Sequence, residues 1–219
     1  MKTAAIFAAA ALVVAACTTT GSGSGQDSAE TKLPDPQKAG GPGIFSMMQQ
    51  RTSAAQATFP SGKLSQSDLS TLLWAASGKN RDGSKWTVPM AMGKPPYCKI
   101  YIATDEGAYL YSWQNNSLVP LTKTNIKADI ATQEFGKKAP VTMVFVSDGD
   151  ELAKLPNPTT AEEFAIMLTG AMSQNVYLAS EALGIGTRLV YSVDREKTAK
   201  HLKLGAKDKV ICAMLMGKK

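Results

Sequence analysis

Side chains that could carry out chemistry by themselves are few in this sequence. His201 is the only histidine, and no cluster of cysteine, histidine and carboxylate residues has the spacing of a metal site. Cys98 and Cys212 each lie in or beside an apolar run typical of a strand, where buried free cysteines are common. An oxidising compartment would permit a disulfide between them, but we expect two reduced thiols in the core. A metal centre or a histidine-based triad therefore has little support, and no side chain stands out as an acid, base or nucleophile.

The remaining cysteine, Cys17, lies at the end of a segment typical of an export signal. Residues 1–16 begin with the positive charge of Lys2 and continue as an uncharged apolar run, too short to span a bilayer comfortably. The end of the run, Val14-Ala15-Ala16-Cys17, resembles the lipobox of bacterial lipoproteins, in which the cysteine thiol receives a diacylglyceryl group. It predicts a signal peptide, lipidation of Cys17 and a periplasmic, lipid-anchored protein, and Thr18 favours the outer membrane. The alternatives are an ordinary cleaved signal with a chance cysteine and a buried N-terminal helix.

Composition divides the remaining chain into a tether and one domain. Residues 17–43 are dominated by Thr, Gly, Ser and Pro, and such a segment cannot bury enough apolar surface to offset its ordering entropy. We therefore expect a flexible linker after the lipidated cysteine. Residues 44–219, about 175 in number, suffice for one domain with a sizeable core. The net charge of +6 is spread thinly, without a basic stripe that carries aromatics, which argues against nucleic-acid binding.

Hydrophobic periodicity and capping signals predict a mixture of helices and strands in the domain. Ser65-Gln66-Ser67-Asp68 is a capping-type helix start, and Asp105-Glu106-Gly107 is a turn signal between two strands of a hairpin. Thr159 and Thr160 offer a cap for a long helix that ends near Leu183; because this helix is apolar on most sides, we expect it to be central or at an interface. The pattern indicates an α+β or α/β layered domain. The expected helices cover residues 44–50, 65–77, 161–183 and 195–202, and the expected strands cover 99–104, 108–112, 141–147, 188–193 and 209–216.

Three segments carry recognisable motifs: LLWAASGKNRDG at residues 72–83, EGAYLY at 106–111 and SQNVYLASEALGIGT at 173–187. They resemble motifs of the nitroreductase family, and the first resembles its periplasmic and thiazole-oxidase-like branch. The last resembles the family's core helix and the glycine-bearing turn after it. The matches follow the family order and cover nearly all of the chain from residue 45 onward. The resemblance implies an α+β domain of three layers, α/β/α, in which a mostly antiparallel central sheet packs against a long central helix.

The resemblance also implies a homodimer that binds FMN at the subunit interface. NAD(P)H or another small-molecule donor would reduce the flavin, and a second small molecule would oxidise it. In this family an Arg-x-Ser-x-Arg/Lys segment binds the flavin phosphate, ribityl chain and pyrimidine edge; here it corresponds to Arg51, Thr52 and Ser53, followed by Ala54 and Ala55. A guanidinium suits bidentate phosphate binding, and a hydroxyl adds a hydrogen bond. Ala55 replaces the second cation, which would stabilise the anionic reduced flavin. The alternative is a surface arginine and a helix-end serine.

A second implied contact is the family's Pro-Ser-Ala-x-Asn-x-Gln-like loop beside the pyrimidine ring. It corresponds here to the candidate residues Pro89, Met90, Ala91, Gly93 and Lys94. Met90 and Gly93 stand in place of the usual serine and asparagine, while Lys94 offers a partial replacement for the missing cation. The alternative is a loop that packs on the core around Pro89.

The glycine turn and the C-terminal lysines complete the implied site. Gly184, Ile185, Gly186 and Thr187 are candidates because glycine lets backbone N–H groups approach a cofactor closely, although Gly184 would also suit a helix cap. Lys218 lies in the region where the family often places a phosphate-contacting basic residue, and a solvated terminus explains it equally well.

These residues predict an FMN-dependent oxidoreductase of nitroreductase type, anchored as a periplasmic lipoprotein. Soluble nicotinamide donors are scarce outside the cytoplasm, so the physiological reductant stays open. The alternative is a domain that kept the fold without the flavin and serves as a binding or envelope-structural lipoprotein. Ala55, Met90 and Gly93 are the features that favour this alternative.

Overall fold

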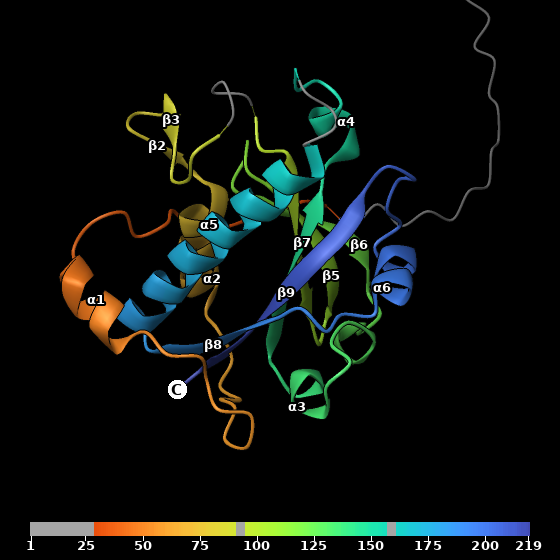
Figure 1. Ribbon diagram of the computed structural model, residues 1–219. Helices are drawn as coiled ribbons and strands as arrows, with labels where there is room; N and C mark the ends of the chain where they lie inside the picture. The colour runs from red at the N-terminus through yellow and green to blue at the C-terminus, as the bar shows by residue number, and fades with distance from the viewer. Residues whose placement is uncertain (1–28, 91–94, 157–160) are drawn as a thin grey trace, which may run out of the picture.

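The computed structural model describes residues 29–90, 95–156 and 161–219 (Figure 1). Within these residues a seven-stranded sheet has the order β1-β6-β5-β4-β7-β9-β8, and β2 and β3 form a separate two-stranded ribbon. The strand pairs are antiparallel throughout. The elements are β1 (Thr31–Lys32), α1 (Ile44–Gln50), α2 (Gln66–Ser77), β2 (Lys79–Asn80), β3 (Lys85–Trp86), β4 (Cys98–Thr104), β5 (Gly107–Ser112), β6 (Ser117–Thr122), η2 (Lys127–Asp129), α3 (Glu134–Lys137), β7 (Val141–Ser147), α4 (Gly149–Leu152), α5 (Ala161–Ala182), β8 (Ile185–Val190), α6 (Arg195–His201) and β9 (Lys209–Lys218).

Local signals explain where the main helices begin. At the start of α2 the Ser65 hydroxyl accepts the amide of Asp68 at 3.0 Å and the Asp68 carboxylate accepts the amide of Ser65 at 3.3 Å, which is a capping box. This confirms the helix start expected from the sequence. The long helix α5 is confirmed over residues 161–182, while its expected caps, Thr159 and Thr160, lie outside the described residues.

The hairpin expected from the sequence is confirmed as β4 and β5. Gly107 begins β5 with φ 145°, and a Cβ atom there would collide with the Thr122 carbonyl of the next strand, so glycine is required at this turn. That next strand, β6, was not expected, because Pro120 interrupts its apolar pattern. Strand β8 begins at Ile185 and not at Arg188, since it pairs with β9 from Lys218 onward.

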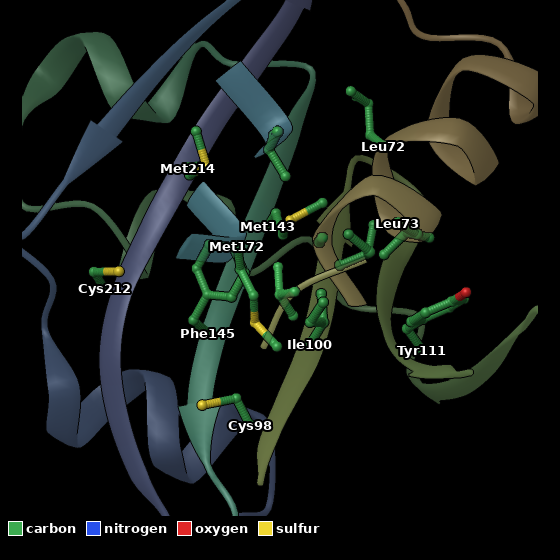
Figure 2. Close-up of a cluster of buried hydrophobic side chains, with 14 of the residues drawn as sticks. Leu72, Leu73, Cys98, Ile100, Tyr111, Met143, Phe145, Met172, Cys212 and Met214 are labelled. Atoms are coloured by element: carbon green, nitrogen blue, oxygen red, sulfur yellow. The ribbon is translucent and has the colours of Figure 1, made fainter. Parts of the chain in front are cut away.

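The sheet is covered on both faces, which gives the three layers that the resemblance implied. Figure 1 shows α1, α2 and α5 gathered at one side of the sheet and α3 and α6 away from them. On the first face, Leu72 and Leu73 of α2 and Met172 of α5 meet Ile100 and Phe145 of the sheet in one buried cluster (Figure 2). A second cluster fills the other face with residues of β7 and β9 and of the segments around η2 and α6. The fold is α+β with a large antiparallel sheet, as the resemblance implied.

The expectation of a flexible linker up to residue 43 is wrong for its C-terminal part. Thr31 and Lys32 form β1 on the edge of β6, and Leu33 is only 2% exposed in the first core cluster. The Ser70 hydroxyl of α2 donates to the Pro34 carbonyl at 2.6 Å, and the Gln37 amide donates to the Thr71 hydroxyl at 3.0 Å. Burial of one large aliphatic side chain and these bonds contribute to ordering the segment, which its polar composition did not reveal. No helix in the described part of the chain is long and apolar enough to cross a membrane.

Candidate functional site

The segment after α1 runs along the free edge of the sheet. Arg51 closes α1, its amide donating to the Met47 carbonyl at 2.8 Å. Three residues later the Ala54 amide donates to the Thr187 carbonyl of β8 at 2.9 Å. Strand β8 is the last strand of the sheet, so this bond uses an edge that otherwise faces outward. The candidate residues Arg51, Thr52 and Ser53 are therefore brought against the candidate residue Thr187.

Tyr177 of α5 fixes this segment from the helix side. Its hydroxyl lies 2.9 Å from the Ser53 Oγ and accepts the Leu189 amide at 2.8 Å. Its ring lies under the Arg51 guanidinium, 5.1 Å from Cζ to the ring centroid, in a cation–π contact. The phenol oxygen thus accepts the Leu189 amide and shares a hydrogen bond with the Ser53 hydroxyl, in which either oxygen can be the donor, so Tyr177 fixes the position of Ser53. One buried side chain thus orients two candidate phosphate ligands.

Two positive groups flank the segment without a carboxylate partner. Arg188 of β8 donates from Nη1 to the Ala54 carbonyl at 3.0 Å, and its Cζ lies 5.6 Å from the centroid of the Phe135 ring. All ion pairs among the described residues use lysine or histidine as the cation, so neither Arg51 nor Arg188 takes part in one. Unpaired guanidinium groups next to an oriented hydroxyl form a site for an anion such as a phosphate ester.

The glycine turn has a structural role in this fold. Gly184, two residues after the end of α5, adopts φ 65°, and its carbonyl accepts the Lys219 amide at 3.0 Å. A Cβ on Gly186 would lie 2.5 Å from the Pro60 ring. Ile185 and Thr187 are 1% and 2% exposed, and the Thr187 hydroxyl donates inward to a carbonyl of β9 at 2.9 Å. A ligand at this turn would therefore meet backbone atoms, because the side chains point into the protein.

Lys218 already has partners inside the fold. Its ammonium lies 3.2 and 3.3 Å from the two carboxylate oxygens of Asp68 and donates to the Leu183 carbonyl at 2.8 Å. Lys219 pairs in the same way with Glu181 at 2.8 Å. An ammonium that is neutralised by a carboxylate attracts a phosphate less than a free one does, so Arg51 is the better placed cation.

The proline-bearing loop lies apart from this cluster as far as it is described. Met90 is half-buried against the first core cluster, while Ala91, Gly93 and Lys94 lie outside the described residues. Asn175 of α5 donates to the Thr87 carbonyl at 3.2 Å, and this bond attaches the residues just before Pro89 to the helix. Since Asn175 and Tyr177 are about 200° apart around the helix, the two segments occupy different sides of α5. Among the described residues, no hydrogen bond or ion pair joins Pro89 or Met90 to residues 51–53.

A cavity of about 340 Å³ opens further along α5, between this helix, β9 and α6. Ile166 of α5 and Tyr191, just after β8, lie at its mouth and are 54% and 73% exposed. Ile166 and Tyr177 lie on one side of the helix, because eleven residues turn it through three turns and about 20°, and they are about 16 Å apart along its axis. The edge between α5 and β8 thus leads from the anion site to the cavity.

The remaining reactive residues are occupied elsewhere. Cys98 and Cys212 are buried and unpaired, which confirms the expected free thiols, and burial raises the pKa of each thiol to about 12. His201 is hydrogen-bonded to the Asp129 carboxylate at 3.0 Å on the opposite face of the sheet. In the described part of the chain no three metal-ligating side chains come together.

Sequence reasoning missed Tyr177 and Arg188 as members of the site. Tyr177 stood inside a recognised helix motif, but its partner Ser53 lies 124 residues away. Arg188 was assigned to the start of a strand, and its partner Ala54 lies 134 residues away. A polar aromatic residue on a helix that is apolar on most sides was the one available signal.

The protein thus has an α+β fold with a candidate anion site at the edge of its sheet, and comparison with known proteins gives its family. The model of the nitroreductase family matches residues 49–218, so the chain belongs to this family. A protein of Methanocaldococcus jannaschii described as a nitroreductase is 26% identical over 171 residues, which cover 74% of this chain and 83% of the other. Members of the family are oxidoreductases that generally use FMN.

Solved structures agree with this assignment. A crystal structure described as a nitroreductase from Ralstonia eutropha has a TM-score of 0.79 and 28% sequence identity, covering 89% of this chain and 91% of that one. A chain of the microcin synthetase complex of Escherichia coli superposes with a TM-score of 0.66 at 18% identity over 78% of this chain and 70% of its own. The latter likeness concerns the fold alone.

Proposed function

We propose that this protein is an FMN-dependent oxidoreductase in which Arg51 and Ser53 hold the phosphate end of the cofactor. The observation that carries the proposal is the unpaired Arg51 guanidinium beside Ser53, both positioned by Tyr177. Bound FMN supplies hydride or electron transfer between a small-molecule donor and a small-molecule acceptor. The chain supplies binding and orientation, which agrees with the lack of an acid, base or nucleophile among the described residues of the site.

The phosphate end of FMN fits beside Arg51 and Ser53, and the rest of the cofactor would extend from there in one direction. The Arg51 guanidinium and the Ser53 hydroxyl suit a phosphate ester, and the cavity near Ile166 and Tyr191 lies further along α5. Leu189, whose amide donates to the Tyr177 hydroxyl, would lie at the phosphate end together with Ser53.

We propose that two copies of the chain form the working unit. Ile166 and Met167 of α5 are 54% and 63% exposed, and Phe45 of the neighbouring helix α1 is 83% exposed. Exposed apolar side chains on adjacent helices are typical of a protein interface. A partner on this face would cover the edge of α5 and close the site against water.

Replacing Ile166 and Met167 by Asp should shift the protein to a monomer in size-exclusion chromatography, and Lys200→Glu, on α6, should leave its elution unchanged. Equal elution of all three proteins would contradict this interface.

The flavin experiment uses the purified Cys17→Ser chain, which carries no lipid. We expect flavin absorbance and release of FMN on denaturation, or uptake of added FMN measured by quenching of its fluorescence. Arg51→Gln should weaken FMN binding by about tenfold to a hundredfold, since it removes a charge-assisted bond to phosphate. Lys137→Gln, at a surface lysine paired with Glu134, should not change the affinity. Colourless protein that takes up no FMN would overturn the proposal.

One set of observations favours a second function, that of a binding or envelope-structural protein without flavin. Lys218 is neutralised by Asp68, and Gly186 packs against Pro60, so two parts of the implied site are engaged within the fold. A flavin-free protein would leave these contacts unchanged, and the FMN titration distinguishes the two functions.

We also propose that the chain is a periplasmic lipoprotein, with the outer membrane as the favoured location. The proposal rests on Val14-Ala15-Ala16-Cys17, which lies outside the described residues. Cys17→Ser should move the protein from the membrane fraction to the soluble fraction, because acyl chains then no longer hold it. Persistence of the variant in the membrane fraction would contradict the anchor.

A further inference from the structure

The two strands at one edge of the sheet are unequal in length, which leaves part of β9 without a partner on that side. The last pair between them joins Val190 of β8 to Ala213 of β9, although β9 begins earlier, at Lys209. The chain then turns away from β9, and Val193 pairs with Ala131 instead. The cavity of about 340 Å³ lies beside this part of β9, where α5 and α6 flank the strand (Figure 1).

Arg195 of α6 bonds the backbone that β8 leaves free. Its Nε donates to the Val210 carbonyl at 3.2 Å, and its Nη2 donates to the Ile211 carbonyl at 3.2 Å. A third, longer bond of 3.5 Å runs from Nη2 to the Tyr191 carbonyl. Within the described residues Nη1 has no hydrogen-bond partner and the guanidinium has no ion pair. Because a guanidinium stays protonated, the cavity wall carries a fixed positive charge with free N–H groups.

Tyr191 adds an aromatic ring at the mouth of the same cavity. The Cζ atom of Arg195 lies over this ring, 4.5 Å from its centroid. Tyr191 is 73% exposed, so the ring face away from the guanidinium is open to a ligand. A planar ring packs favourably on such a face, and the guanidinium limits the movement of the tyrosine.

Most other charges of the lining are neutralised within the fold. Glu162 pairs with Lys209 at 2.7 Å, and Asp208 pairs with Lys99 at 2.9 Å. Glu196 is a lining carboxylate that has no ion pair with a described residue. The aliphatic members of the lining are Ala165, Ile166, Ala199, Val210 and Ile211. The cavity thus combines an apolar volume, an exposed ring and an unpaired guanidinium.

We propose that this cavity binds a small planar aromatic carboxylate, whose ring packs on Tyr191 and whose carboxylate accepts from Nη1 of Arg195. Its volume is at the lower end of the range for small-molecule sites and has room for one ring with a short substituent. A neutral ligand would leave the guanidinium without a counter-ion, and an aliphatic acid would lose the contact with the tyrosine ring.

This site is separate from the phosphate end of the proposed flavin site. Ile166, at the mouth of the cavity, lies about 16 Å from Tyr177 along the axis of α5. The cavity is lined by neither Arg51 nor Ser53. The inference therefore goes beyond the proposed function and does not require bound FMN.

The test titrates the Cys17→Ser chain with 4-fluorobenzoate and follows the fluorine NMR signal, with and without saturating FMN. We expect binding of similar affinity in both conditions. Arg195→Gln should weaken it by at least about tenfold, since a charge-assisted hydrogen bond is lost. Tyr191→Ala should weaken it by about threefold to tenfold through loss of the ring contact. Lys200→Gln, on the same helix but outside the cavity, is the matched control and should not change the affinity.

The charge of the ligand is tested by a second variant and a second probe. Glu196→Gln removes the unpaired carboxylate and should tighten the binding of 4-fluorobenzoate by about twofold to fivefold. The amine 4-fluorobenzylamine should bind at least about tenfold more weakly than the acid. An amine that binds as well as the acid would contradict recognition by Arg195.

Tyr191→Ala changes an exposed side chain, so the test does not depend on whether Arg195→Gln folds. Absence of 4-fluorobenzoate binding, or equal affinity in the wild type, Arg195→Gln and Tyr191→Ala, would overturn the inference. Displacement of the probe by FMN, or its loss in Arg51→Gln, would locate it at the proposed flavin site and would also overturn it. A wild-type chain that binds the probe and no FMN would overturn the proposed function and leave this inference standing.

Discussion

The hydroxyl of Tyr177 offers the sharpest test of the site, because removing one atom breaks two contacts and spares a third. Tyr177→Phe deletes the bond of 2.9 Å to Ser53 and the bond of 2.8 Å from the Leu189 amide. The ring stays, and with it the cation–π contact to Arg51. Any effect of the change on stability or FMN affinity is therefore caused by the loss of the bonds to Ser53 and to β8, and not by a shift of the guanidinium.

The expected magnitude follows from the burial of the side chain. Tyr177 is 8% exposed, so its hydroxyl exchanges little with water, and each bond contributes about 0.5–1.5 kcal/mol. Loss of both should lower the free energy of unfolding by about 1–3 kcal/mol in urea denaturation followed by circular dichroism. The affinity for FMN should fall by about threefold to tenfold, since the phenol no longer holds Ser53 in position.

Tyr111→Phe is the matched control. Its hydroxyl is also in a buried tyrosine but makes one bond, to the Asn116 side chain at 3.2 Å, far from the site along the sheet. It should cost about half as much stability and leave FMN binding unchanged. If Tyr177→Phe and the wild type unfold at the same urea concentration, the two bonds do not stabilise the fold and the reasoning is refuted. A Ser53→Ala variant that weakens FMN binding while Tyr177→Phe does not would refute the orientation of Ser53 by the phenol.

Three further predictions concern the rest of the fold. Gly186→Ala should lower the free energy of unfolding by about 1–3 kcal/mol because its Cβ meets a proline ring at 2.5 Å, whereas Gly205→Ala, with its nearest contact at 3.7 Å, should change it by less than about 0.5 kcal/mol in the same urea titration. Cys98 and Cys212 keep their protons in the folded state up to a pKa of about 12, while unfolded thiols lose them near 9.0, so stability should fall as the pH rises between these values. Replacing both cysteines by Ala should flatten that fall in thermal denaturation scans, and an unchanged slope would contradict the burial of the thiols. Leu33→Ala should cost about 2–5 kcal/mol, and a value near zero in urea would contradict the packing of the N-terminal segment.

The sequence predicted those elements whose signals are local. The capping residues before α2, the turn between β4 and β5 and the apolar run of β7 each specify an element from neighbours in the chain. Strand β6 was missed because Pro120 disfavours a central strand, and the structure tolerates it next to the irregular register between Ala108 and Tyr109. Strand β1 was missed because its stability comes from Leu33 and from bonds to α2, which composition does not reveal.

The site was predicted only in part, for the same reason. Arg51 and Ser53 carry a short motif and were named, whereas Tyr177 and Arg188 enter the site through contacts that span more than a hundred residues. The glycines of the turn were interpreted as ligand contacts, yet their conformations are already required by the end of α5 and by Pro60. One residue type can meet a local steric need and a functional need, and sequence spacing does not separate the two.

The two edge strands of the sheet, β1 and β8, have different roles. Strand β1 fastens the N-terminal segment at one border, and β8 carries the anion site at the other. Six spacings of about 4.8 Å place these borders on the order of 29 Å apart. A force applied to the N-terminal segment would therefore act on β6 and on the packing of Leu33, and not on Arg51 or Tyr177. The edge formed by β8 lies apart from the attachment of the N-terminal segment.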